Sequence, residues 1–339
     1  VNEEPRIQSV MRILISAGLS VYTSSDELLL LVILSLLKLS LGHGNSPLSP
    51  IAYAGYGHFL STVFKQRRQG YEFGRLAVRL QERIGIRAYD CRITLFFGIL
   101  LQHNQEPLRN TLEYFPNTHR NGLAAGDLPY AGHSIMQHIA HLFMTGEKLP
   151  RIVATIRESR QDLLKSGHQA SIGIVEVYER ASLNLQEMED RELTTENTED
   201  KPVLSNYYLV RMAMETLHGK WEEAEQSLQK MKAVLDGATG TFIIPLYQFY
   251  GALISLGQIH PGLGILRKRA LLDRAKRYLR TLEGYRASAP QNHENKCHLI
   301  QAELHRVAGQ EEKALVCYEK SIRAARKNGF LPEEAMALE

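Results

Sequence analysis

Three histidines in the segment GHSIMQHIAHLF could bind a metal ion: His133, His138 and His141. His138 and His141 are three residues apart, so they would share one face of a helix. Two imidazoles placed in this way can ligate zinc, but a zinc site needs a third ligand and polar groups that orient the ligands. No HExxH motif is present, and no cysteine or carboxylate stands at a matching spacing nearby. We therefore expect no metal here, and we expect neutral imidazoles that offer hydrogen bonds on a helix surface or in a groove.

Glycine-rich segments were compared with the loops that cradle phosphates. The segment GHGNSP at 42–47 does not match GxxxxGK[ST], and no strand precedes it. The segment GLGILRK at 262–268 has one G-x-G but lacks the third glycine and the strand of a dinucleotide site. The motifs GxSxG, HRD, DFG and DxDxDG are absent. We therefore expect a chain that is not an enzyme, with no catalytic residue and no cofactor.

A cluster of aromatic and polar residues occupies 53–73, and arginines between Arg67 and Arg83 add positive charge to the same stretch. Aromatic residues at helical spacing are typical of a core, whereas the glycines at 55, 57 and 74 indicate close helix approach or an open groove beside them. Repeat proteins that bind peptides use a concave surface with aromatic and arginine side chains, and a partner with some acidic character would suit this one. The candidate groove includes the three histidines named above. Its residues are Tyr53, Tyr56, His58, Arg75, Arg79, His133, His138 and His141.

The candidate residues lie in a sequence that predicts successive helices separated by short turns. Strand-like alternation between turn residues is nearly absent, and the helical segments run about 15 to 20 residues. The expected helices are 7–22, 25–42, 48–66, 69–84, 87–104, 106–125, 128–145, 148–166, 169–188, 203–218, 220–235, 241–257, 265–283, 293–307, 311–327 and 331–339.

Several of these helices form pairs with small residues at repeating offsets of seven, five and four, which is the tetratricopeptide pattern. A glycine ends the first helix of a pair, where a left-handed backbone costs little, and alanines allow close approach. The two clear copies are Ala302, Gly309, Ala314 and Tyr318, and Met212, Gly219, Ala224 and Leu228. Looser copies surround Gly146 and the stretch from Gly70 to Ala77. The sequence therefore predicts an all-α, tetratricopeptide-like α-solenoid of stacked antiparallel helix pairs, whose inner wall is the working surface.

One segment interrupts this pattern. Residues 187–202, EMEDRELTTENTEDKP, are acidic and polar and lack apolar periodicity. They are expected to be a solvated loop, or alternatively a linker or regulatory segment. The predicted organisation is an N-terminal helical-repeat array at 1–186, the acidic loop or linker at 187–202, and C-terminal tetratricopeptide-like repeats at 203–339.

Composition limits the classes of partner. The 339 residues carry a net charge of +3 that is spread along the chain, which argues against nucleic acid because such binders concentrate their basic residues. The run LLLLVILSLL at 28–37 is shorter than the roughly 20 residues that a membrane span needs, so a helix buried on all sides is expected instead. The start VNEEPRI lacks the features of a signal peptide, and we expect a cytoplasmic piece of a longer protein.

The chain also resembles a segment of very large multidomain signalling kinases. The similar stretches are LLLLVILSLLKLSLGHGNSPLSPIAYAGYGHFL at 28–60, GYEFGRLAVRLQERIG at 70–85, HNQEPLRNTL at 103–112, GLAAGDLPYAGHS at 122–134 and LIQAELHRVAGQEEKALVCYEKSI at 299–322. In those proteins a serine/threonine-kinase-like domain and an AAA-type ATPase precede a tetratricopeptide-like region, and a GAF sensor and a histidine kinase follow it. The resemblance implies that this chain is the helical region, without kinase or ATPase residues of its own.

Three hypotheses for function follow. The first is a non-catalytic scaffold or sensor of such a kinase, which binds a protein or peptide segment, for instance the neighbouring ATPase or kinase domain. The second is the ligand-sensing repeat domain of an ATP-dependent transcription regulator. The third is an unrecognised enzyme, whose site would lie on the His133–His141 face and would need a pocket with convergent titratable groups.

Overall fold

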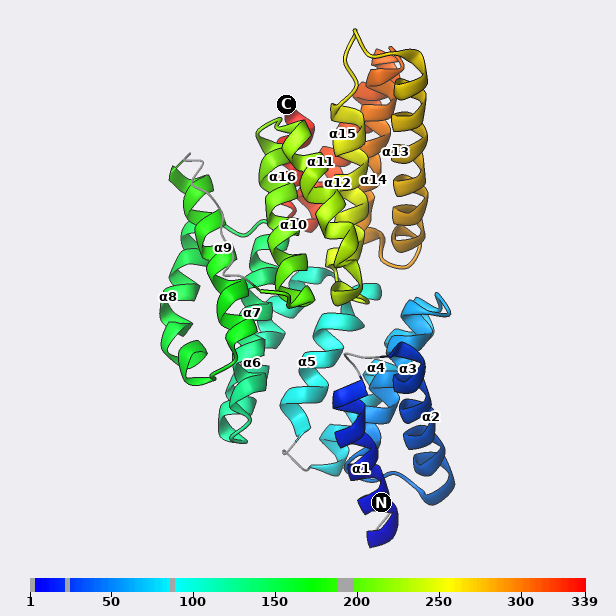
Figure 1. Ribbon diagram of the computed structural model, residues 1–339, viewed down its shortest axis with the longest axis vertical. Coiled ribbons are helices and arrows are strands. Elements are labelled where there is room, and N and C mark those ends of the chain that lie inside the picture. Colours follow the sequence, from blue (N-terminus) through cyan, green and yellow to red (C-terminus); the bar gives the residue numbers. More distant parts are fainter. Residues whose placement is uncertain (1–3, 22–24, 86–88, 188–197) are drawn as a thin grey trace. The chain divides into compact units, whose positions relative to one another are not determined.

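The computed structural model describes residues 4–21, 25–85, 89–187 and 198–339 (Figure 1). These residues form sixteen α-helices and no strand, and every segment expected to be helical overlaps one of the helices. The all-α prediction is therefore confirmed. No helix in the described part of the chain is both long and apolar enough to cross a membrane.

The chain divides into two compact units, the first comprising residues 1–105 and 117–131 and the second residues 106–116 and 132–339. The helices of the first unit are α1 (Pro5–Val21), α2 (Asp26–His43), α3 (Ser49–Thr62), α4 (Arg67–Ile84) and α5 (Asp90–Leu100), with the short 3₁₀ helix η2 (Gln102–Asn104). Two helices have residues in both units: α6 (Thr111–Ala124) and α7 (Leu128–Met144).

The second unit holds the remaining helices. They are η3 (Leu108–Asn110), α8 (Leu149–Lys165), α9 (Gln169–Glu187), α10 (Lys201–Leu217), α11 (Trp221–Ala233), η4 (Leu235–Ala238), α12 (Ile243–Gly257), α13 (Ile265–Arg286), α14 (Pro290–Val307), α15 (Glu311–Asn328) and α16 (Leu331–Leu338). The helices α9 and α10, on either side of the acidic segment, lie in the same unit and pack against each other. Residues 188–197 of the acidic segment lie outside the described residues.

In the first unit each helix packs against the next one along the chain, and α3 also contacts α5. The tightest crossing is that of α3 and α4, where Gly57 faces Gly70. A Cβ built on Gly70 would lie 2.4 Å from the carbonyl oxygen of Gly57, so the two backbones are in direct contact. The glycines at 57 and 74 thus serve close helix approach, one of the two alternatives that the sequence left open.

The apolar helix α2 is not buried on all sides, so that expectation is wrong. Ile33 and Leu36 are buried against α1 and α3, but Leu28 is 52% exposed and Leu31 is 59% exposed. The run LLLLVILSLL contains aliphatic residues on every face of the helix, so its composition could not show which face the neighbouring helices leave open.

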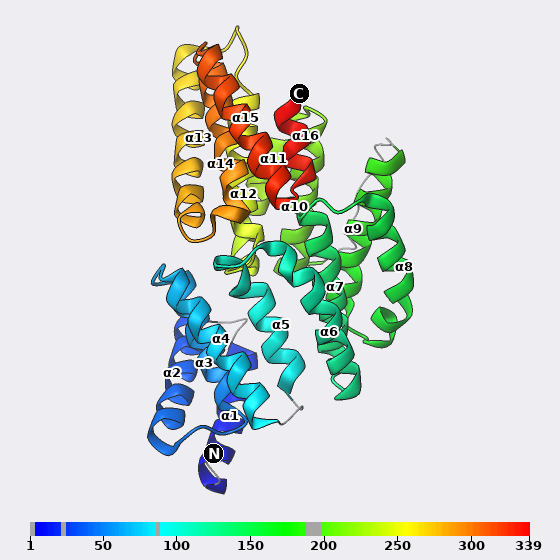
Figure 2. The ribbon, with the colours of Figure 1, turned by 180° about the vertical axis from the view of Figure 1, so that it is seen from behind.

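In the second unit the helices α10 to α15 form antiparallel pairs (Figure 1). The helices α10, α12 and α14 contact one another in succession, and α11, α13 and α15 each pack beside the first helix of their pair. Figure 2 shows the pairs α12–α13 and α14–α15 side by side from behind.

Two of these pairs turn at a glycine with a left-handed backbone. Gly219 and Gly309 have φ angles of 66° and 70° and lie between α10 and α11 and between α14 and α15. These left-handed angles favour glycine, which ends the first helix and lets the chain reverse. The small residues Ala224, Ala302 and Ala314 of these pairs are buried.

Candidate functional site

The tyrosines of the candidate groove lie partly in the core of the first unit. Tyr53 is buried, and its hydroxyl group donates a hydrogen bond to Oδ1 of Asn45 over 3.0 Å. Tyr56 is half-buried, and its ring meets the ring of Phe73 edge-on at a centroid distance of 4.9 Å. These contacts connect α3 to α4 and to the turn before α3, which is a packing role.

His58 is buried deeper than a groove residue would be. Its side chain is 8% exposed, and its ring lies edge-on to the rings of Phe59 and Phe96, at 5.7 and 5.9 Å. Burial lowers the pKa of His58 to about 4, because the surroundings cannot solvate an imidazolium ion.

The two arginines of the candidate groove lie on the exposed side of α4. Arg75 places its guanidinium group 5.9 Å from the centre of the Tyr71 ring and donates a hydrogen bond to the Tyr71 hydroxyl over 3.1 Å. Arg79 is exposed one turn later on the same helix. The structure therefore places the arginines at the surface, and it does not bring them together with Tyr53 and His58.

The three histidines of α7 point to different neighbours. The ring of His141 is buried, with Nδ1 2.8 Å from the Thr111 hydroxyl. The ring of His133 stacks on that of His168, with a centroid distance of 5.8 Å. His138 is half-buried near Arg151, and burial followed by the Arg151 charge lowers its pKa to about 4. No group of three or more potential ligands that could hold a metal ion occurs among the described residues.

Buried histidines make stability depend on pH. Burial lowers the pKa of His133, as of His58, to about 4, whereas an unfolded histidine titrates near 6.5. Below pH 6.5 the unfolded state binds a proton that the folded state does not, so the free energy of unfolding should fall as the pH decreases toward 4. The expected slope is about 1.4 kcal/mol per pH unit for each histidine. Chemical denaturation followed by circular dichroism measures this slope.

The variant His58→Asn tests the assignment for the first unit. Between pH 6.5 and 4.5, the free energy of unfolding of this variant should depend on pH less steeply than that of the wild type, by about 1.4 kcal/mol per pH unit. Between pH 7 and 8 the two proteins should show the same slope. A variant with the same slope as the wild type over the acidic range would contradict the burial of this imidazole in its neutral form.

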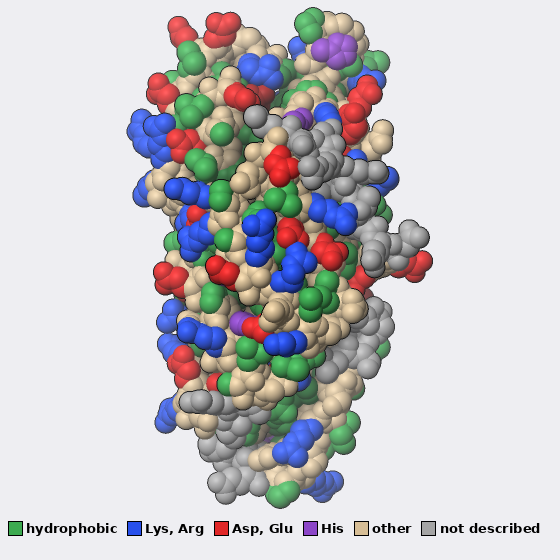
Figure 3. Space-filling view, turned by 90° about the vertical axis from the view of Figure 1, so that its left-hand side faces the viewer, with side chains coloured by type: hydrophobic (Ala, Val, Ile, Leu, Met, Phe, Trp, Pro, Cys, Tyr) green, Lys and Arg blue, Asp and Glu red, His purple; other side chains and the backbone are tan. Residues whose placement is uncertain are grey.

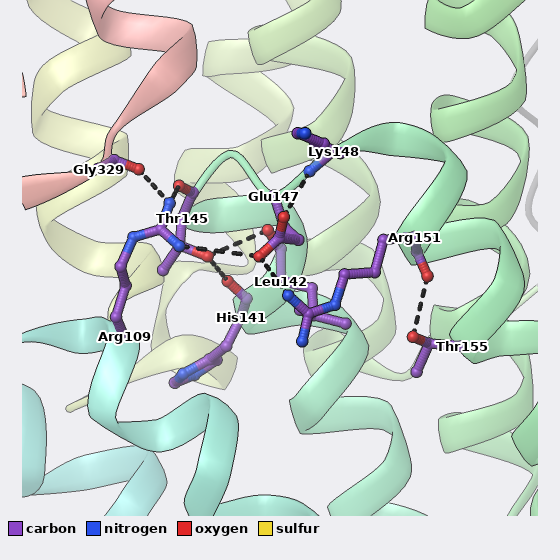
Figure 4. A network of polar contacts seen from close by, with 9 residues as sticks. All are labelled: Arg109, His141, Leu142, Thr145, Glu147, Lys148, Arg151, Thr155 and Gly329. Carbon is purple, nitrogen blue, oxygen red and sulfur yellow. Dashed lines mark hydrogen bonds and ion pairs between the residues drawn. The ribbon is translucent and has the colours of Figure 1, made fainter. Parts of the chain in front are cut away.

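A polar network of the second unit centres on Arg109, which sequence reasoning did not single out (Figure 4). Its guanidinium group donates hydrogen bonds to the carbonyl oxygen of Thr145, over 2.9 Å, and to that of Gly329. Glu147 lies 3.8 Å away and also accepts a hydrogen bond from Arg151 over 3.0 Å. The network thus joins η3, the turn between α7 and α8, and the turn between α15 and α16.

Asn292 at the start of α14 holds the same N-terminal segment. Its Oδ1 accepts a hydrogen bond from the amide of Leu108, and its Nδ2 donates one to the carbonyl oxygen of Glu106, each over 2.8 Å. The helix expected at 106–125 begins only at Thr111, because Pro107 has an extended backbone with a ψ of 133°. The segment 106–110 thus holds only the short η3, and Asn292 of α14 binds its backbone at Glu106 and Leu108.

Arg109 connects η3 to the turn between α7 and α8 and to the turn between α15 and α16, and its removal should destabilise the second unit. We expect Arg109→Met to lower the free energy of unfolding of the second unit by about 1.5–3 kcal/mol, because charge-assisted hydrogen bonds are lost. The fluorescence of Trp221, the only tryptophan, reports on this unit during urea denaturation. Arg151→Met is the matched control, because Arg151 contacts the same glutamate but is exposed, and it should cost less than about 1 kcal/mol. Equal losses for both variants would contradict the role of Arg109.

A buried ion pair lies between α14 and α16. The Nζ atom of Lys296 is 2.7 Å from Oε1 of Glu333, and both side chains are almost fully buried. The ammonium group also sits 3.7 Å from the centre of the Phe330 ring. Burial lowers the pKa of Lys296, while the Glu333 carboxylate acts in the opposite direction.

Comparison with known protein families, with curated proteins and with solved structures finds no match for this chain. The site residues must therefore be interpreted from their own geometry. Arg109, Asn292, Lys296 and Glu333 all contact protein groups, and their contacts connect helices. Burial raises the pKa of the Cys297 thiol to about 12, so this side chain stays protonated and is a poor nucleophile.

The surface carries charges of both signs. On the face drawn in Figure 3, Lys and Arg side chains are interspersed with Asp and Glu side chains, and hydrophobic side chains lie between them.

Proposed function

We propose that this chain is a non-catalytic helical-repeat scaffold or sensor region of a multidomain signalling kinase with an ATPase module. In this role it binds a protein or peptide segment, either from another chain or from a neighbouring domain of its own protein. The parent architecture is taken from the resemblance of the five sequence segments described above, and the binding role is inferred from the structure.

The observation that carries the proposal is the succession of helix pairs in the second unit. The helices α10, α12 and α14 follow one another in contact, and the pairs that begin at α10 and α14 reverse at Gly219 and Gly309. Repeated pairs of this kind present long rows of side chains from successive helices, which suit extended protein partners. This arrangement supports a tetratricopeptide-like solenoid.

One side of α14 is covered by other segments of the chain. Phe330 and Glu333 cover Lys296 of α14, and Asn292 of α14 binds the segment 106–108. Residues of the chain itself thus occupy this side of α14. We therefore propose that partners bind to exposed outer faces of the helices.

Cross-linking of the purified chain in a lysate of its source organism, followed by mass spectrometry, would identify candidate partners. The recovered protein is then produced separately and titrated against the chain. Saturable binding, with a change in ATP hydrolysis when the recovered partner is an ATPase, supports the proposal. A recovered DNA-binding regulator would instead favour the ligand-sensing domain of a transcription regulator. A chain that binds no protein, or that converts a small-molecule substrate, contradicts it.

A further inference from the structure

The helix α13 has one buried side and one exposed side with distinct chemistry. Leu271, Ala275, Leu279 and Leu282 are buried at intervals of three and four residues, which matches one face of a helix. The opposite face carries a set of exposed side chains that we call the α13 stripe: Ile265, Leu266, Arg269, Lys276, Arg277 and Arg280. Their spacing of three, four and seven residues places them on one side of the helix.

The cations of the stripe have no acidic partner in the described part of the chain. None of Arg269, Lys276, Arg277 and Arg280 lies within ion-pair distance of a described carboxylate. Arg274, on the side of α13 that faces the other helices, is different. Its guanidinium group binds both carboxylate oxygens of Glu225, over 2.8 and 2.6 Å. On the same helix, Arg274 is thus paired with a carboxylate, whereas the cations of the stripe are exposed to solvent.

The stripe also has an apolar end. Ile265 and Leu266 are each 85% exposed, more than any other large hydrophobic residue among those described. Two adjacent aliphatic side chains held in water at the start of a helix indicate a contact surface. An apolar anchor beside a row of charges is the usual composition of an interface core and its rim.

A hollow lies along the basic part of the stripe. It is shallow and open to solvent, and its lining residues all belong to α13: Asp273, Leu279 and the three cations Lys276, Arg277 and Arg280. The row from Arg269 to Arg280 spans about 16 Å along the helix axis. Side chains of a second helix lying alongside could enter this hollow and reach each cation in turn.

We propose that the α13 stripe docks an acidic amphipathic helix of a partner protein. Carboxylates of that helix, spaced at three and four residues, pair with Arg269, Lys276, Arg277 and Arg280, and an aliphatic residue packs on Ile265 and Leu266. This inference rests on the proposed function and names the chemistry of the partner. Charge complementarity supplies the rate and specificity of docking, and the apolar pair supplies contact area.

A protein helix fits the stripe better than an anionic membrane does. Asp273 lies in the middle of the stripe and is exposed, so it would repel anionic headgroups. In a protein partner, a basic residue opposite Asp273 would pair with it and fix the register. The apolar pair lies at one end of the stripe, whereas membrane-surface helices carry an apolar face along their length.

The test uses a synthetic helical peptide with glutamates at the matching spacing, one lysine opposite Asp273 and two leucines at the end that meets Ile265. A second peptide has the same composition with the glutamates distributed around the helix. Fluorescence anisotropy in low-salt buffer should show binding of the patterned peptide, and the scrambled peptide should bind at least about tenfold more weakly.

Two charge-reversal variants of the whole chain complete the test. The triple variant Lys276→Glu, Arg277→Glu, Arg280→Glu should weaken binding of the patterned peptide by about tenfold or more. The control Lys313→Glu, Lys320→Glu, Arg323→Glu changes the net charge equally on exposed positions of α15 and should stay within about twofold of the wild type. Circular dichroism verifies that both variants keep their helix content.

Several results would overturn the inference. These are equal binding of both peptides, equal loss in both variants, or binding to phosphatidylserine vesicles in place of the patterned peptide. The outcome is separable from that of the proposed function. If a cross-linked partner binds the triple variant as tightly as the wild type, the docking role of the α13 stripe is wrong but the proposed function stands. If the chain binds no protein partner, the proposed scaffold function is wrong.

Discussion

The variant Glu333→Gln is expected to lower the free energy of unfolding of the second unit by about 3 kcal/mol, because it leaves the Lys296 ammonium buried without its counter-charge. The two side chains are 0% and 3% exposed, and the atoms that pair are 2.7 Å apart. Glutamine has nearly the same volume as glutamate, so a cavity does not contribute to the loss. Urea denaturation followed by the fluorescence of Trp221 measures the effect.

The neighbouring residue provides the control. Glu334 lies on the same helix and pairs with Arg326, whose side chain is 61% exposed, so Glu334→Gln should cost less than about 1 kcal/mol. The double variant Lys296→Met, Glu333→Leu replaces the pair by apolar groups and should recover most of the stability lost in Glu333→Gln. Equal losses in Glu333→Gln and Glu334→Gln would show that the buried carboxylate does not compensate the lysine.

The variant Gly70→Ala should destabilise the first unit by about 2–3 kcal/mol, because the added methyl group overpacks the crossing of α3 and α4. A Cβ at this position would lie 2.0 Å from Oγ of Ser61 and 2.4 Å from the carbonyl oxygen of Gly57. The serine side chain can rotate, but the Gly57 carbonyl belongs to the backbone of α3. The two helices must therefore separate. Thermal unfolding followed by circular dichroism measures the change in midpoint.

Gly42→Ala is the matched control for this prediction. Gly42 is also a helical glycine of the first unit, but a Cβ there would meet nothing within 4 Å. Because alanine loses less backbone entropy on folding, Gly42→Ala should be neutral or stabilising by up to about 1 kcal/mol. If Gly70→Ala behaved in the same way, the close contact of the two helices would be refuted.

The helices could be predicted from the sequence because their signals are local. Apolar periodicity marks each helix, and Gly219 and Gly309 mark reversals of the chain that need a left-handed backbone. The exception is the helix expected at 106–125. There Pro107 and the hydrogen bond between Leu108 and Asn292 hold the first residues in another conformation.

The candidate groove could not be predicted in the same way, because periodicity places a residue on a face without showing what covers that face. Tyr53, His58 and Arg75 looked equivalent as aromatic or polar members of one cluster. The structure buries the first two against neighbouring helices and exposes the third. The connections that sequence reasoning missed, at Arg109 and Lys296, depend on partners that are distant along the chain and carry no local signal.

The hydrogen bonds of the segment 106–110 have a consequence for how the second unit folds. In an open repeat array each unit touches only its neighbours, so the array can begin to fold anywhere and can fray from its ends. Here Leu108 is bound to Asn292, 184 residues later, and Arg109 to Gly329, 220 residues later. Contacts of such high sequence separation slow folding and join the two ends of the unit in one cooperative transition. A ribosome must therefore release Gly329 before Arg109 can reach its final position, and the amide of Leu108 should exchange with deuterium only when the whole unit opens.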